Sequence, residues 1–272
     1  MIVDIPGKCV KMESDMEEGC NRHLTAPARP VSGQIVNYSI DDVYEVLQEL
    51  TEHSADYAGI FDCKRLAALR ELHRKYGAKF SMFCFEEAIG YHISSVTTKF
   101  QREFRRNSDW LKFGYHGKDY QTKFHQEYPL KDFGKSYENV ERAIAAFAGE
   151  ISLCHTIRLH FFMCTEEAKV FLREKGIVGL LAADDARVSY DLSKEESACL
   201  DKERLFEKGL SYYKTDMRLE HVEDMQASLR SMQGLERVVI FTHEYELGHQ
   251  LGKLEEAIRF FSQQGYVSSF FE

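Results

Sequence analysis

The chain has 272 residues, enough to bury one large core, and α/β barrels of this length commonly form a single domain. Hydrophobic residues make up 44% of the sequence and charged residues 29%, which are the proportions of an ordinary globular protein and argue against disorder over most of the chain. The net charge of -9, without any run of five or six like charges, argues against nucleic acid as a partner.

The seven cysteines are scattered and contain no C-x-x-C pair, so the sequence does not predict a zinc site made of cysteines alone. The first twenty residues hold several acids and no apolar segment typical of a signal peptide, and no stretch approaches the ~20 apolar residues of a membrane span. We therefore expect a cytoplasmic protein without a membrane partner, and the sequence leaves its oligomeric state open.

Residues 1–33 show no sustained periodicity and contain three of the four prolines, which predicts an extended N-terminal arm. Residues 34–272 alternate short β-rich runs with segments of helical periodicity, and we predict a single (β/α) barrel domain there. The predicted strands span 35–40, 80–85, 111–115, 155–160, 177–182, 238–242 and 266–270. The predicted helices span 42–52, 64–76, 97–106, 137–148, 166–174, 221–232 and 253–263. Residues 188–218 are predicted to be an insertion with one or two extra strands.

Seven strands that alternate with helices favour parallel βα units, and a closed or nearly closed barrel accommodates them better than an open sheet. In βα barrels the working residues lie at the carboxyl ends of the strands. The ionisable residues that follow the predicted strands are Asp41 and Asp42, His116, Arg158 and His160, Asp184 and Asp185, and His243 and Glu244. Together they predict a divalent-metal hydrolase site.

The pair Asp41-Asp42 comes directly before a predicted helix, and two interpretations are open. An acid at this position can cap the helix by accepting backbone N–H bonds. Alternatively, one carboxylate ligates a metal while its neighbour takes a proton from the attacking water.

Imidazole and guanidinium groups follow the third and fourth strands. His116 is either a satisfied core or loop histidine or a metal ligand, and imidazole with carboxylate suits zinc, with cobalt, manganese and iron as alternatives. Arg158 and His160 are expected on one face of their strand, because strand side chains repeat every second residue. Arg158 needs a carboxylate partner, for which an Asp of the first pair is the obvious candidate; a purely structural ion pair would look the same. His160 is a candidate third ligand or oxyanion donor.

The last ionisable group belongs to the strand before the final predicted helix. His243 sits where a general acid could protonate a leaving group, and Glu244 could orient its ring; a buried structural histidine is the alternative. Asp184 and Asp185 could instead fix the tautomer of such a histidine, or serve only as turn residues.

Five segments, taken in order, resemble the motifs of the polysaccharide deacetylase family. Ser39-Ile-Asp-Asp42 resembles T-F-D-D, and Lys75-Tyr-Gly-Ala-Lys-Phe-Ser-Met-Phe83 is similar to K-Y-G-V-K-A-T-F-F. His116 matches the first histidine of H-[ST]-x-x-H, Arg158-Leu-His-Phe161 aligns with R-P-P-Y, and Phe241-Thr-His243 resembles L-x-H. The family consists of metal-dependent carbohydrate esterases built on an irregular seven-stranded βα barrel.

The resemblance implies a role for several of these residues. It implies that Asp41 is the catalytic base, tethered by Arg158, that Asp42 and His116 hold the metal, and that His243 is the general acid. It also implies that the backbone of the Arg158 motif helps to bind the oxyanion.

The sequence departs from the family pattern at the second ligand histidine, where Tyr120 stands, and at both prolines of R-P-P-Y. We predict His160 as the third ligand, with His125 as the alternative. The aromatic residues Tyr115, Tyr120 and Phe161 suggest a different or narrower substrate than that of the family.

The sequence therefore predicts a metal-dependent hydrolase of carbohydrate metabolism that deacetylates an N-acetylated sugar or related glycoconjugate, with a small-molecule or oligosaccharide substrate. One alternative is a non-catalytic carbohydrate-binding or regulatory barrel that has lost the metal motif. Another is a metal-independent glycosidase with Asp41, Asp184 or Glu244 as paired carboxylates.

Overall fold

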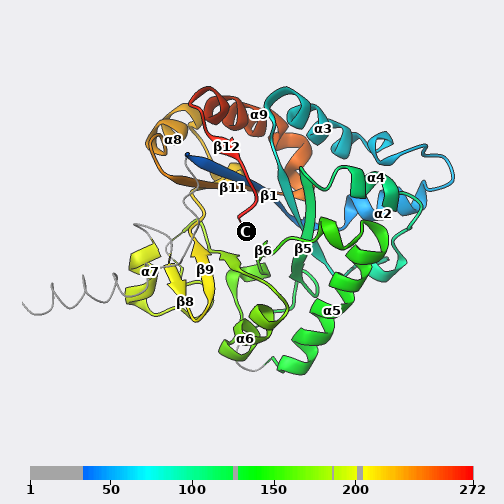
Figure 1. The fold of residues 1–272 in the computed structure, drawn as a ribbon, viewed down its shortest axis with the longest axis horizontal. Coiled ribbons are helices and arrows are strands. Elements are labelled where there is room, and N and C mark those ends of the chain that lie inside the picture. The colour runs from blue at the N-terminus through cyan, green and yellow to red at the C-terminus, as the bar shows by residue number, and fades with distance from the viewer. Residues whose placement is uncertain (1–32, 125–127, 186, 201–204, 272) are drawn as a thin grey trace, which may run out of the picture.

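The computed structural model describes residues 33–124, 128–185, 187–200 and 205–271 (Figure 1). The predicted N-terminal arm, apart from its last residue, and the alternative ligand His125 lie outside the described residues, so both stay predictions. Within the described part, strands occupy the centre of the molecule and the helices lie around them (Figure 1). No helix in this part is both long enough and apolar enough to cross a membrane.

The larger sheet is parallel and contains the strand ends of greatest interest. Its hydrogen-bonded order is β10-β11-β1-β2-β5, and β12 pairs with the first residues of β1. The strands are β1 (Ile35–Val43), β2 (Phe80–Phe85), β5 (Leu111–Gly117), β10 (Met217–Arg218), β11 (Arg237–His243) and β12 (Val267–Ser268). Because all run in one direction, their carboxyl ends meet at one edge of the sheet.

A second sheet has the order β6-β7-β9-β8, in which only the pairing of β8 with β9 is antiparallel. Its strands are β6 (Thr156–Ile157), β7 (Gly179–Leu181), β8 (Leu205–Glu207) and β9 (Leu210–Tyr213). One bridge, between Phe113 and Leu153, links β5 to the segment before β6. The structure is thus a mixed α/β fold, and both the count of seven core strands and their closure into one barrel stay predictions.

The segment 188–218 differs from the expected insertion. β9 pairs in parallel with β7, and β10 pairs in parallel with β11, so this segment supplies strands to both sheets. It also contains helix α7 (Lys194–Leu200). The short β-rich runs did not reveal this pairing, because strand partners are set by contacts between distant segments.

The helices bury one apolar face each. They are α2 (Glu45–Glu52), α3 (Lys64–Tyr76), α4 (Gln101–Arg106), α5 (Leu130–Phe147), α6 (Glu166–Glu174), α8 (Met225–Ser231) and α9 (Leu247–Gln263). α3 ends as predicted at Gly77, which takes the left-handed conformation at φ 71°. α5 and α9 begin seven and six residues before their predicted starts, at positions where glycine or polar residues interrupt the apolar period.

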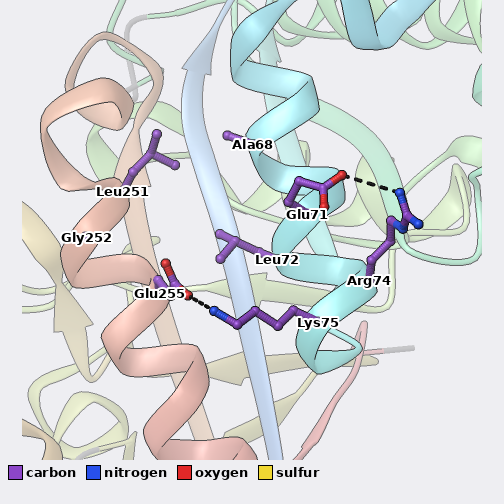
Figure 2. A pocket seen from close by; sticks show the side chains of 8 residues that line it. All are labelled: Ala68, Glu71, Leu72, Arg74, Lys75, Leu251, Gly252 and Glu255. Carbon is purple, nitrogen blue, oxygen red and sulfur yellow. Dashed lines mark hydrogen bonds and ion pairs between the residues drawn. The ribbon is translucent and has the colours of Figure 1, made fainter.

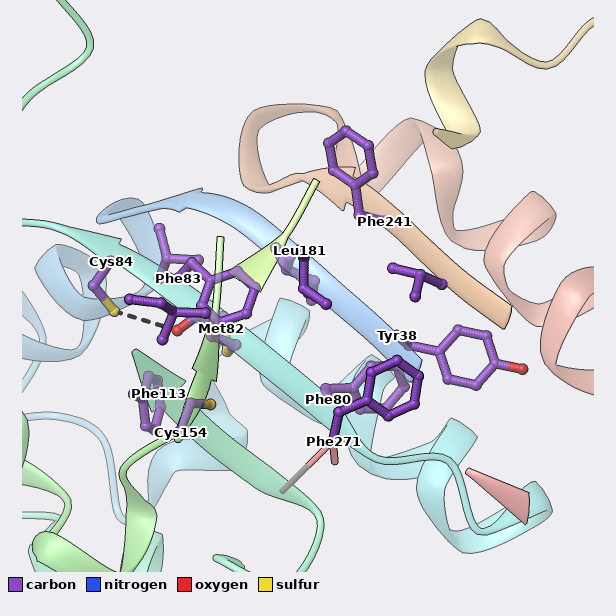
Figure 3. Packing of buried hydrophobic residues seen from close by; sticks show 14 of the residues in the cluster. Tyr38, Phe80, Met82, Phe83, Cys84, Phe113, Cys154, Leu181, Phe241 and Phe271 are labelled. Atoms are coloured by element: carbon purple, nitrogen blue, oxygen red, sulfur yellow. Dashed lines mark hydrogen bonds between the residues drawn. The ribbon is translucent and has the colours of Figure 1, made fainter. Parts of the chain in front are cut away.

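Side chains from both sheets fill the interior (Figure 3). Tyr38, Phe80, Phe113, Leu181 and Phe241 are each at most 2% exposed and come from five different strands. Burial of such large apolar side chains is the main favourable contribution to folding. This packing holds the strands that carry the candidate site.

A surface groove of about 620 Å³ separates α3 from α9 (Figure 2). The Nζ atom of Lys75 lies 2.6 Å from Oε1 of Glu255 across it. Both side chains are exposed, so this ion pair contributes little to stability. The residues predicted for chemistry do not line this groove.

Candidate active site

The end of β1 turns two consecutive carboxylates toward different partners. Asp42 has a left-handed backbone at φ 58°, and the pairing of β1 with β2 shifts register between Ile40 and Val43. Aspartate is one of the few residues besides glycine that takes this conformation readily. A bulge of this kind redirects side chains. Asp41 faces Arg158, and Asp42 faces His116.

Arg158 is fully buried, and three side chains accept hydrogen bonds from its guanidinium group. Its Nη1 atom donates to the two carboxylate oxygens of Asp41 at 3.0 and 3.2 Å and to the hydroxyl of Ser39 at 2.7 Å. Its Nη2 atom donates at 2.9 Å to the Thr215 hydroxyl, which in turn donates to the Ala182 carbonyl at 2.6 Å. A buried charge requires such pairing. The expected partner of Arg158 is therefore the one in contact, and Ser39 and Thr215 complete its surroundings.

Asp42, His116 and His160 each direct one donor atom toward a common point. These atoms lie within 4.8 Å of one another. Oδ1 of Asp42 is 3.0 Å from Nε2 of His116 and 3.5 Å from Nδ1 of His160, and the two ring nitrogens are 3.2 Å apart. The described residues contain no other group of three such donors.

The second nitrogen of each imidazole contacts a backbone carbonyl. Nδ1 of His116 lies 2.7 Å from the Arg158 oxygen, and Nε2 of His160 lies 3.2 Å from the Tyr120 oxygen. A carbonyl only accepts, so these two nitrogens carry the hydrogens. Nε2 of His116 and Nδ1 of His160 then present lone pairs to each other and to Asp42. Carboxylate oxygen and imidazole nitrogen are common metal ligands. Histidines that bind a metal typically donate the hydrogen of their other ring nitrogen to a carbonyl or carboxylate, as both histidines do here.

The Asp42 carboxylate likewise has an oxygen atom that no hydrogen-bond donor among the described residues contacts. Its Oδ1 atom is buried and makes no hydrogen bond of good geometry. Burial raises the pKa of Asp42, but the imidazoles of His116 and His160 outweigh burial and hold the pKa well below its usual range. Burial likewise lowers the pKa of His116, while Asp42 raises it overall. The lone pairs of these three residues face one another and repel unless a cation or an added proton lies between them. The residues therefore fit a divalent cation.

His160 reaches the site by a route other than the predicted strand face. β6 ends at Ile157, and His160 begins the 3-10 turn η4 (His160–Phe162). Phe161 inside this turn has a φ of 57°, a conformation that costs free energy for a non-glycine residue. A tight turn thus brings His160 beside His116, where alternation along a strand was expected to place it beside Arg158.

Tyr120 contributes its backbone to the site, and its side chain points elsewhere. The side chain is 49% exposed, and its hydroxyl accepts a hydrogen bond from Gln121. The Tyr120 carbonyl contacts His160. Among the described residues, His160 is the histidine that lies where the missing second histidine of the motif would be needed.

His243 lies at the end of β11, in register with Asp41 on β1. Its Nε2 atom is 4.0 Å from Oδ2 of Asp42, and its Nδ1 atom is 3.2 Å from Oε1 of Glu220. Glu220 also accepts from the His243 backbone N–H at 2.6 Å and from the Thr242 hydroxyl at 2.8 Å. Tyr245 stacks on the His243 ring with centroids 5.2 Å apart. Glu220 therefore sets the ring orientation of His243.

Sequence reasoning missed Glu220 and assigned its role to other acids. Asp184 lies 3.3 Å from Nδ1 of His221, and Asp185 pairs with Arg187 at 2.6 Å. Glu244 contacts backbone N–H groups of α2. The only sequence signal for Glu220 was an acid between the segment interpreted as an insertion, which ends at residue 218, and the next predicted helix.

These contacts also bear on the paired-carboxylate alternative. Asp41 is engaged by Arg158, Asp184 by His221, and Glu244 by the backbone of α2. A glycosidase needs two carboxyl groups that flank the substrate bond. Each of the three proposed carboxylates has a different partner, so the arrangement does not favour that chemistry.

Replacing Glu220 by Gln is expected to remove a pH-dependent part of the stability. Burial raises the pKa of Glu220, but hydrogen bonds from His243 outweigh it and bring the pKa to about 2, from an ordinary 4.5. The folded state therefore favours the ionised form, and its contribution, about 2–3 kcal/mol, is present above pH 4.5 and is lost as the pH falls toward 2. Urea unfolding of the wild type and of Glu220→Gln should show a stability gap that narrows over this range. Glu223→Gln, at an exposed neighbour, should show no such change; a Glu220 gap independent of pH would contradict the prediction.

No family model matches the sequence, and no curated protein matches it. Several solved structures, however, are similar to this chain. A protein of Mycobacterium smegmatis assigned as a polysaccharide deacetylase superposes with a TM-score of 0.56 at 14% identity, over 90% of this chain and 91% of that one. The chain has the polysaccharide deacetylase fold. The Bc1960 peptidoglycan N-acetylglucosamine deacetylase gives a TM-score of 0.52 at 11% identity, covering 93% of both chains. A Streptococcus mutans CE4 esterase gives 0.51 at 13% identity, covering 93% of this chain and 89% of that one.

The resemblance found in the sequence motifs is thereby confirmed at the level of the fold. The identities of 11–14% make this chain a divergent example of the polysaccharide deacetylase fold. Because one fold serves different functions, the activity has to be argued from the site.

Proposed function

We propose that this protein is a divalent-metal-dependent hydrolase that removes the acetyl group from the amide nitrogen of an N-acetylated sugar or related glycoconjugate. The observation that carries the proposal is the convergence of an ionised Asp42 with two imidazole lone pairs, from His116 and His160. The Asp41–Arg158 pair and His243 lie beside these donors, so a base and an acid adjoin the proposed metal position.

Asp42, His116 and His160 would hold the cation, for which we expect zinc, with cobalt, manganese or iron as alternatives. A bound divalent cation supplies Lewis acidity toward a carbonyl oxygen and toward water. The carbonyls of Arg158 and Tyr120 keep the two rings oriented, since each fixes the hydrogen on the nitrogen that faces away from the site.

Asp41 is proposed as the general base. It is 1% exposed, and both of its oxygens accept from one guanidinium nitrogen of Arg158, which leaves lone pairs for the proton of an attacking water. Ser39 and Thr215 hold the guanidinium in place. Arg158 thus pairs with the carboxylate and fixes its direction.

His243 is proposed as the general acid. Glu220 accepts from Nδ1, which leaves Nε2 facing Asp42 and the site. An imidazolium held in this way can give its Nε2 proton to the departing amine nitrogen. Base and acid are carried by β1 and β11, which pair directly, so substrate bound at these strand ends would be reached by both.

The surroundings of the site favour a small sugar derivative. Tyr245, 51% exposed, covers His243, and Phe161 packs on His160 with centroids 4.0 Å apart. A hollow of about 640 Å³, within the range of small-ligand pockets, is lined by Tyr91, His92 and Tyr120 among others, and the Tyr120 carbonyl also contacts His160. Two of the similar structures are named as a peptidoglycan N-acetylglucosamine deacetylase and a CE4 esterase, which supports an acetylated sugar as substrate.

The decisive experiment measures the metal content of the purified protein and its release of acetate from N-acetylglucosamine oligosaccharides. We expect about one bound divalent ion per chain, loss of turnover after chelation, and its recovery when zinc or cobalt is added back. A protein that neither contains nor binds these ions would favour the non-catalytic carbohydrate-binding alternative. Turnover that survives complete chelation would contradict the proposed mechanism.

A further inference from the structure

Glu244 directly follows His243, and its carboxylate is 1% exposed. Its Oε2 atom accepts from the backbone N–H groups of Tyr44 and Glu45 at 2.8 and 2.7 Å, and Oε1 accepts from that of Val46 at 2.9 Å. These three N–H groups form the start of α2, the helix that follows Asp42. The Glu244 side chain, directly after the end of β11, thus accepts three hydrogen bonds from residues 198 to 200 positions earlier in the sequence.

α2 has no side-chain cap of its own. Tyr44 occupies its N-cap position and makes no capping bond. Asp41 and Asp42, for which capping of this helix was one of the two interpretations, face Arg158 and His116 instead. The first N–H groups of a helix need acceptors, and a carboxylate there also interacts favourably with the helix dipole.

Two other helices are capped by the side chain of their own N-cap residue. Asp224 caps α8 by accepting from Ala227, and Thr165 caps α6 by accepting from Ala168. The cap of α2 differs because it comes from the strand that carries the proposed acid. Moving the capping function to Glu244 leaves both aspartates available for the site.

We propose that Glu244 is a positioning residue that fixes the Asp41-Asp42 turn relative to His243, an inference that rests on the proposed function. The β1 end is bulged and left-handed at Asp42, so strand pairing alone does not define the direction of its side chain. The three hydrogen bonds to Glu244 anchor the chain immediately after this bulge. Without these three hydrogen bonds, the distance between Asp42, the proposed metal ligand, and His243, the proposed acid, is no longer fixed.

The groups that face Glu244 make the test specific. They are the phenols of Tyr44 and Tyr91, the thiol of Cys84 and the guanidinium of Arg65. Three N–H donors require an acceptor on each side of the carboxylate, so Gln, which has one oxygen and one NH₂ group, cannot reproduce the contacts. Burial raises the pKa of Glu244 to about 7, and measurements at pH 8 therefore keep it ionised.

The experiment compares Glu244→Gln with Asp224→Asn, which makes the same carboxylate-to-amide change at the cap of a helix away from the site. Three quantities are measured at pH 8: Co²⁺ affinity by titration, kcat and KM for an N-acetylglucosamine oligosaccharide, and hydrogen exchange of the amides at residues 44–46. For Glu244→Gln we expect about tenfold or greater losses of Co²⁺ affinity and kcat, the size typical of lost outer-shell contacts, with KM within about twofold. Its amides at 44–46 should exchange faster. Asp224→Asn should leave Co²⁺ affinity and kcat unchanged.

Two outcomes would overturn the inference. In one, Glu244→Gln speeds exchange at residues 44–46 but keeps wild-type Co²⁺ affinity and kcat, so that the cap only stabilises the helix. In the other, exchange at these amides does not change. If Glu244→Gln does not fold, Glu244→Asp, which keeps the charge on a shorter side chain, should show a smaller loss of the same kind, and wild-type values would again overturn it. A wild-type protein without deacetylase activity would refute the proposed function, whereas Co²⁺ affinity would still decide the role of Glu244.

Discussion

Asp41→Asn is expected to lower kcat by about 10²–10⁴-fold, the usual contribution of a general base, while the protein keeps its divalent metal. The amide of Asn has almost the volume of the carboxylate, and its oxygen can still accept from Arg158, but it cannot take a proton from water. Asp42, His116 and His160 are unchanged by the substitution, so metal binding should persist. Acetate release and metal analysis on the same sample would test both statements.

The control for this variant addresses the buried charge that it leaves behind. Arg158 is fully buried, so removing the charge of Asp41 should also lower the thermal stability, which has to be measured before kinetics are interpreted. Asp109→Asn makes the same chemical change at an exposed position and should alter neither activity nor stability. An Asp41→Asn protein that is folded, metal-loaded and fully active would remove Asp41 from the role of base.

His160→Ala is expected to abolish tight metal binding, and with it turnover. His160 is one of three donors within 4.8 Å, so its loss should weaken Zn²⁺ or Co²⁺ affinity by more than the about 10–100-fold typical of outer-shell substitutions. Tyr120→Phe should leave the affinity unchanged, because Tyr120 contacts His160 through its backbone carbonyl. Titration of the metal-free proteins with either ion would measure the difference.

His155→Ala is the matched control, since His155 is exposed and precedes the amino end of β6. It should bind metal as the wild type does. Retained affinity in folded His160→Ala would instead mean that the third ligand is another residue, with His125 the next to be substituted.

Local patterns were enough to place many elements. Helix α3 and helix α6 begin and end where the periodicity predicts, because each has a strong local stop or start: Gly77 in the left-handed conformation and Thr165 as an N-cap. The fourth predicted strand is much longer than the observed one, because β6 covers only two of its six residues. Its β-branched and apolar residues favour a strand, but the chain leaves the sheet after Ile157 and enters the turn at His160–Phe162.

In the proposed site, too, some contacts follow from the sequence and others only from the tertiary structure. Charge and burial alone indicated that Arg158 needed a carboxylate, and the structure brings it to Asp41. The same reasoning could not choose the acid that orients His243, because Asp184, Asp185, Glu220 and Glu244 are chemically similar. Only the path of the chain after β10 places Glu220 beside that ring.

By itself, the sequence determined the alternation of strands and helices and the ionisable residues at strand ends, since both are written in short-range periodicity and residue type. Tertiary structure alone decided how the strands divide between two sheets, which acid meets His243, and that Glu244 caps α2. These depend on contacts between segments up to 200 positions apart, whose geometry no local pattern contains.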